Sequence, residues 1–154
     1  MFRTYTNLSK ETGIIEYIAE NLSHQNREEA KIIASFIPLR ELLAVEVAEA
    51  EKGFVFFDEK GNPYGIGGIR PGGRIFFVMC EGTTTAMHVS ALKAGRRWLK
   101  EQLEHYHRID GYCWEENKLS QRWMRWMGFE FADADSAATI TVDGHNFLYF
   151  MRTE

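Results

Sequence analysis

The stretch Asn117–Phe129 reads NKLSQRWMRWMGF. Asn117 carries a side-chain oxygen that can accept a hydrogen bond from the free amides at the start of a helix. Apolar residues then recur at the spacing of one helical face, and Gly128 can take the left-handed conformation that follows a helix end. The stretch therefore predicts a capped helix over 119–127, after which Phe129 begins an extended segment.

The segments on either side of this helix alternate between helical and extended periods. Ser9 is expected to cap the first helix and Pro38 to open the third, while residues 24–26 form a polar break. Asp143-Gly144 indicates a turn between the last two strands. The predicted elements are strand 2–6, helices 10–23, 27–36 and 38–50, strands 54–57, 64–70 and 74–80, helix 86–106, strand 109–114, helix 119–127, and strands 129–134 and 147–151. This order predicts an α+β fold with a mixed sheet.

Length and composition narrow the class of protein. The 154 residues, 45% of them hydrophobic, are expected to form one domain spanning 1–154 around one core. A formal net charge of −4 disfavours a nucleic-acid binder. Cys80 and Cys113 have no spacing typical of a metal site, so no metal is expected. No apolar run reaches the ~20 residues of a membrane span, so we expect a cytoplasmic protein without a membrane partner.

The spacing from Asn117 to Gly128-Phe129, together with the order of elements, resembles the GNAT superfamily of acetyl-CoA-dependent N-acetyltransferases. The resemblance covers nearly the whole chain. It implies a mostly antiparallel sheet with helices on both faces and a splay between the fourth and fifth strands. In the family, acetyl-CoA lies in that splay, and its pantetheine pairs with the backbone of the fourth strand. The matching positions here are Val78, Met79 and Cys80.

The loop that holds the pyrophosphate of acetyl-CoA in the family departs from its usual pattern in this chain. The family pattern is Arg/Gln-x-x-Gly-x-Gly/Ala, whereas Thr83 falls at the Arg position, Ala86 at the first Gly and His88 near the second. Three consecutive hydroxyls and the amides beside them still offer hydrogen bonds to a phosphate. The cofactor contacts that the resemblance implies, besides the fourth strand, are Thr83, Thr84, Thr85, Asn117, Arg122 and Arg125.

The general acid of the family also differs. Many members place a Tyr seven residues after the Asn to protonate the departing thiolate, and Met124 stands there in this chain. Transfer would then need Tyr112, another donor or bulk water as the source of the proton. Glu115 and Glu116 follow the fifth strand and can take a proton from an amine, although paired acids in a turn are more often solvated. His88, at the start of the long helix, is a further candidate for a base. Its place on the apolar face of that helix is also typical of a histidine at the edge of the core.

These departures leave two main functions open. In the first, the chain is a catalytically silent GNAT-fold protein that binds acetyl-CoA weakly or not at all. It also resembles small GNAT-like proteins of short-tailed bacteriophages, of the internal virion protein A type. That resemblance implies a phage protein that acts through a host or virion protein, in the bacterial cytoplasm or the virion. In the second, the chain is an active N-acetyltransferase that uses an acyl-CoA to modify a small amine or a protein amino group.

A third function is considered because aromatic and basic residues interleave between positions 93 and 126, which is also the pattern of a platform for single-stranded nucleic acid. The helical spacing of the tryptophans instead favours packing in the core. A homodimer is compatible with every one of these functions. The four tryptophans are Trp98, Trp114, Trp123 and Trp126.

Overall fold

One mixed sheet organises the chain. The computed structural model describes all residues from Met1 to Glu154. The strands pair in the order β1-β2-β3-β4-β5-β8-β6, and β7 pairs with β8. They are β1 (Phe2–Tyr5), β2 (Lys52–Phe57), β3 (Pro63–Arg70), β4 (Arg74–Met79), β5 (Arg108–Trp114), β6 (Glu130–Phe131), β7 (Ile140–Val142) and β8 (His145–Thr153). The helices are the 3₁₀ turn η1 (Leu8–Lys10) and α1 (Thr12–Glu20), α2 (His24–Ile33), α3 (Leu39–Glu49), α4 (Thr85–Tyr106) and α5 (Lys118–Trp126).

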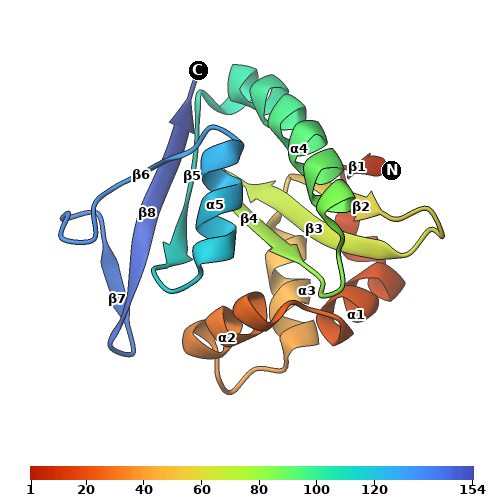
Figure 1. Cartoon of the computed structure of the whole chain (residues 1–154), viewed down its shortest axis with the longest axis horizontal. Helices are drawn as coiled ribbons and strands as arrows, with labels where there is room; N and C mark the ends of the chain where they lie inside the picture. The colour runs from red at the N-terminus through yellow and green to blue at the C-terminus, as the bar shows by residue number, and fades with distance from the viewer.

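Helices cover both faces of the sheet (Figure 1). On one face, Trp98 of α4 packs edge-on against Phe54 of β2, with ring centroids 4.8 Å apart. On the other face, α1 and α3 pack against β3. Because both faces are covered, the residues of β3 are buried from Pro63 to Ile69. The predicted α+β fold, with a mostly antiparallel sheet between helices, is confirmed.

β4 and β5 meet near their starts and then separate. They are the one parallel pair, and their single paired position joins Arg74 to Asp110. The Asp110 N–H donates to the Gly73 carbonyl at 3.0 Å, and the Asp110 carboxylate accepts from Arg74 Nε at 2.9 Å and from the Tyr149 hydroxyl at 2.6 Å. We call these four residues the apex. Beyond the apex the strands diverge toward α2 (Figure 1), so the expected splay is present.

The second half of the chain follows the prediction closely. The longest helix, expected over 86–106, is α4, and the helix expected over 119–127 is α5. Gly128 ends α5 at φ +96°, as its position after the helix indicated. Trp98 and Trp123 are buried as predicted, but packing in the core was wrong for Trp126, which is 47% exposed. No helix combines the length and the hydrophobicity that crossing a bilayer requires.

The prediction was wrong at the start of two N-terminal helices. Ser9 does not cap α1, because η1 intervenes and the Ser9 hydroxyl donates instead to Asn7 Oδ1 at 2.7 Å. Residues 24–26, expected as a polar break, form the first turn of α2. Ser23 caps this turn, and its hydroxyl oxygen accepts from the Asn26 N–H at 3.3 Å.

The C-terminal strands differ from the prediction in their pairing. The strand expected over 129–134 shrinks to β6, and the Asp143-Gly144 turn joins β7 to β8. Both turn residues have positive φ, 49° and 77°, which is the requirement of a tight hairpin of this hand. The turn signal was therefore correct, while its first partner strand was missed.

Candidate functional site

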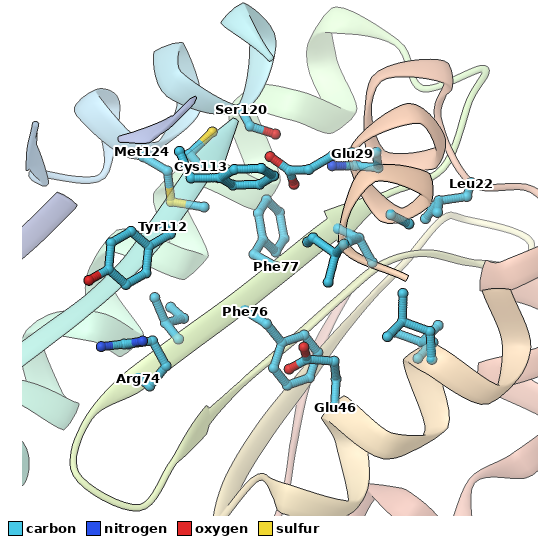
Figure 2. A pocket seen from close by; sticks show the side chains of 18 of the residues that line it. Leu22, Glu29, Glu46, Arg74, Phe76, Phe77, Tyr112, Cys113, Ser120 and Met124 are labelled. Atoms are coloured by element: carbon cyan, nitrogen blue, oxygen red, sulfur yellow. The ribbon is translucent and has the colours of Figure 1, made fainter. Parts of the chain in front are cut away.

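A cavity of about 320 Å³ opens where β4 and β5 separate. Of its 24 lining residues, 18 are hydrophobic, so the few polar side chains that face it decide its chemistry. Figure 2 shows Glu29 and Glu46 on opposite sides of the cavity, with Phe76 and Phe77 of β4 between them. The charged or amide side chains that line the cavity are Asn26, Glu29, Glu46, Arg70 and Arg74.

Residues of α2 and the turn before it occupy the open edge of β4. Asn26 Oδ1 accepts from the Met79 N–H at 3.0 Å, and the Ser23 N–H donates to the Met79 carbonyl at 2.9 Å. Two positions further on, the Glu81 N–H donates to the Asn21 carbonyl at 2.8 Å. Both backbone groups of Met79 are therefore engaged within the chain.

Glu29 makes the matching contact to β5. It lies one turn after Asn26 on α2, and its Oε1 accepts from the Trp114 N–H at 2.7 Å. The carboxyl lies between the cavity walls, and this burial raises its pKa from the ordinary 4.5 to about 7, against the lowering effects of Trp114, Asn117 and Cys113. Asn117 Nδ2 lies against this carboxyl without reaching hydrogen-bonding geometry. Two side chains of α2 thus bridge the open mouth between β4 and β5.

Glu46 of α3 is the second carboxyl that faces the cavity. Its Oε2 is buried without a hydrogen bond, and Arg70 Nη1 stands 3.9 Å away. Burial raises the pKa of Glu46, while the Arg70 charge opposes this shift. The same guanidinium is already bonded to Glu49 at 2.8 Å. Glu46 is therefore an acceptor that lacks a donor.

The Glu29→Gln variant is expected to be more stable than the wild type above about pH 7. With the carboxyl pKa raised to about 7, the folded chain binds more protons than the unfolded chain between pH 4.5 and 7, so Glu29 lowers stability as the pH rises through this window. The substituted amide avoids the buried charge and keeps an oxygen for the Trp114 N–H.

Chemical denaturation at about pH 8 is expected to show a gain of about 1–2 kcal/mol for this variant, and a much smaller gain at about pH 5. Glu28→Gln is the matched control, because Glu28 is the preceding residue of α2 and its carboxylate faces Lys31 at 3.1 Å. A gain for Glu29→Gln that is equal at both pH values would contradict the prediction.

The structure brings part of the predicted catalytic set to the cavity. Tyr112 lines it, under the Arg74 guanidinium at 5.0 Å from the ring centroid. Glu115 and Glu116 follow β5 outside the cavity, and the Glu115 backbone pairs with Asn146 and Gln121. His88 lies apart from the cavity, where its ring packs edge-on against Trp123 at 5.0 Å.

The residues expected at the pyrophosphate are engaged in local structure. Thr83 Oγ1 bonds to the His88 ring, Thr84 Oγ1 caps α4 by accepting from the Met87 N–H at 3.2 Å, and Thr85 is the first residue of α4. The conformation of this loop is set by Gly82, at φ +76°.

The remaining predicted contacts belong to the fourth strand and α5. Val78 lines the cavity, whereas Cys80 is buried and its N–H donates to the Tyr64 carbonyl at 2.8 Å. Asn117 caps α5 by accepting from the Ser120 N–H at 3.2 Å. Arg122 and Arg125 are exposed on α5, and Arg125 lies over the Phe131 ring.

Sequence reasoning missed Asn26 and Glu29 as residues of the site, and it placed Glu46 among the polar residues of the N-terminal helices without a specific role. One sequence signal pointed to Asn26 and Glu29. They are one helical turn apart and follow Ser23, a residue that can cap a helix, so they are expected on the same face of that helix. Reading 24–26 as a break concealed this spacing. Glu46 carried no such signal, since its role depends on where α3 packs.

Comparison with solved structures shows which fold this is. No protein-family model and no curated protein sequence matches the chain. A GNAT-family acetyltransferase from Bacillus anthracis aligns over 99% of this chain and 94% of its own length, at 16% identity and a TM-score of 0.67. The structure of AAC(6')-Ib in complex with paromomycin and acetyl-CoA aligns over 100% of this chain and 93% of its own length, at 14% identity and a TM-score of 0.61.

A spermidine N-acetyltransferase variant from Vibrio cholerae covers 99% of this chain and 94% of its own length, at 14% identity and a TM-score of 0.58. Identities this low establish the fold alone. The chain has the GNAT fold, and the cavity described above lies in the splay of that fold. No group of three or more His, Cys, Asp or Glu side chains is arranged to share a metal ion.

Proposed function

We propose that this chain is a single-domain GNAT-fold protein, spanning 1–154, that works by binding another protein rather than by transferring an acetyl group. The observation that carries the proposal is the closure of the β4 edge, where both backbone groups of Met79 are bonded to the start of α2. The residues present do not fit an acetyl-CoA molecule in the position that the resemblance implies.

The free energy of these contacts indicates how strongly they oppose the cofactor. A pantetheine strand along β4 and β5 would have to displace the Asn26 and Ser23 bonds to Met79 and the Glu29 bond to Trp114. At about 1 kcal/mol net for each bond, the displacement costs about 3 kcal/mol, or roughly two decades in Kd. Acetyl-CoA binding is therefore weak.

Two further features support the proposal. The Thr84 hydroxyl oxygen already accepts a hydrogen bond as the cap of α4, and the Thr83 hydroxyl is bonded to His88, so both side chains are held in local structure. Met124, which lines the cavity, stands where the resemblance places the proton donor (Figure 2). Methionine has no proton to give. The second resemblance, to small phage proteins, adds a phage origin and a host or virion protein as partner, with the bacterial cytoplasm or the virion as location.

Calorimetric titration with acetyl-CoA tests this proposal. The wild-type chain is expected to give no saturable heat at about 1 mM ligand. Asn26→Ala, which frees the Met79 amide, is expected to bind at least about threefold more tightly than the wild type, whereas the exposed Asn21→Ala stays like the wild type. Saturation of the wild type below about 0.1 mM, with release of free CoA on addition of an amine, would overturn the proposal.

A second candidate function, N-acyl transfer to an amine, is favoured by one specific observation. The carboxyl of Glu29 has a pKa raised to about 7 and lies in an apolar cavity, which are the properties of a general base for an ammonium group. Under this alternative, Glu29→Gln lowers the transfer rate by about 100-fold or more. The rise of the wild-type rate with pH near 7, where the Glu29 carboxyl loses its proton, is also absent in the variant. A rate unchanged in Glu29→Gln would remove the alternative.

A further inference from the structure

The mouth of the cavity is apolar and exposed. Ile33, at the end of α2, is 51% exposed, and Ile140, on β7, is 41% exposed; both line the cavity. The loop from Ile33 to Leu39, another lining residue, carries Phe36, which is 85% exposed. Large apolar side chains at the rim of an apolar cavity are typical of a surface that another molecule covers.

The interior of the cavity carries an excess of acidic groups. Glu29 and Glu46 both face it, and the Glu46 Oε2 atom is buried without a donor. The only cationic residues that line the cavity are Arg70, bonded to Glu49, and Arg74, bonded to Asp110. Each cation lies closest to a carboxylate that does not line the cavity, and Arg70 Nη1 keeps only a longer contact of 3.9 Å to Glu46 Oε2.

These two features together select an occupant. An apolar surface alone would accept many partners, but a buried acceptor without a donor is costly until a donor arrives. An ammonium or guanidinium on a hydrocarbon stem supplies that donor, and its stem packs against the cavity walls. Phosphate groups and acidic segments would instead meet Glu29 and Glu46 with the same sign of charge.

We infer that this cavity is the docking site for a partner protein, which inserts a lysine or arginine flanked by apolar side chains between Glu29 and Glu46. This inference rests on the proposed function and names the chemistry of its partner. The basic side chain reaches the two carboxyls, while its apolar neighbours cover Ile33, Phe36 and Ile140. A single long side chain in a desolvated pocket is the usual anchor of a protein interface.

Selection from a displayed library of random dodecapeptides, with the full chain immobilised, tests this inference. Enriched peptides are expected to share a Lys or Arg with apolar residues on both sides. The leading peptide, made synthetically, is expected to bind at least about tenfold more weakly to a Glu29→Gln, Glu46→Gln double variant.

The matched control is a Glu28→Gln, Glu41→Gln double variant, which leaves the Arg70–Glu49 pair intact. Each control residue lies on the same helix as its partner in the test, and neither lines the cavity. This variant is expected to bind the leading peptide as the wild type does. Circular dichroism shows whether each variant is folded, and Ile140→Ser, which alters only the rim, gives a second loss of binding if the double variant does not fold.

Three results would overturn the inference: a library without enrichment, enriched peptides that lack a basic residue, or equal losses in the test and control variants. This failure is distinct from failure of the proposed function. Tight acetyl-CoA binding would overturn the proposed function while leaving the peptide selection intact. An empty selection with no acetyl-CoA binding would overturn the docking site alone.

Discussion

Gly73→Ala is expected to lower the free energy of unfolding by about 3 kcal/mol. Gly73 has φ +94°, a conformation that costs a residue with a Cβ about 1–2 kcal/mol. A Cβ at this position would also lie 2.3 Å from the carbonyl oxygen of Arg108. Because that oxygen belongs to the backbone of β5, it cannot rotate away, and the apex between β4 and β5 must shift.

Gly72→Ala is the matched control for this prediction. Gly72 has nearly the same backbone conformation, φ +88°, but a Cβ at this position would meet no atom within 4 Å. It is therefore expected to lose only the conformational part, about 1 kcal/mol. Urea denaturation of both variants measures the difference. Equal losses at positions 72 and 73 would show that the close approach to Arg108 is unimportant.

Asp110→Ala is expected to cost about 2–3 kcal/mol of unfolding free energy. Asp110 is 7% exposed, and its carboxylate accepts from both Arg74 and the Tyr149 hydroxyl. Removing the carboxylate leaves two donors without their acceptor at the point where β4 meets β5. The backbone hydrogen bond from position 110 to Gly73 remains, so the loss of unfolding free energy stays within this range.

Tyr149→Phe separates the two hydrogen bonds of this carboxylate, which also lies 3.8 Å from Arg108 Nε. It removes one hydroxyl and keeps the ion pair with Arg74, so a loss of about 1 kcal/mol is expected. Thermal unfolding of both variants gives the comparison, with each 1 kcal/mol worth roughly 3 °C at this chain length. If Asp110→Ala unfolds no more easily than Tyr149→Phe, the ion pairs of Asp110 with Arg74 and Arg108 contribute nothing.

The Gly73 and Asp110 variants both act on the apex, and the apex sets the shape of the cavity. The strands are joined at Arg74 and Asp110 and are held apart at their far ends by Asn26 and Glu29. A change at the apex therefore moves the walls that Phe76 and Phe77 form (Figure 2). We expect apex variants that remain folded to bind the selected peptides more weakly than the wild type.

The order of the elements and the ends of the later helices follow from local signals in the chain. Asn117 and Gly128 act through a cap within one turn and a positive φ, so their effects can be predicted without knowing what packs nearby. The period of α4 was equally clear, because a helix of 22 residues repeats its apolar face many times. These local signals were sufficient to indicate the GNAT fold.

The contents of the cleft depend instead on contacts between distant segments. Glu29 is 85 residues from Trp114 in the sequence, and Asn26 is 53 residues from Met79, so no local pattern links either pair. The raised pKa of Glu29 likewise depends on walls contributed by β4 and β5. Helix caps are set by neighbours along the chain, whereas the closing of this cleft is set by neighbours in space.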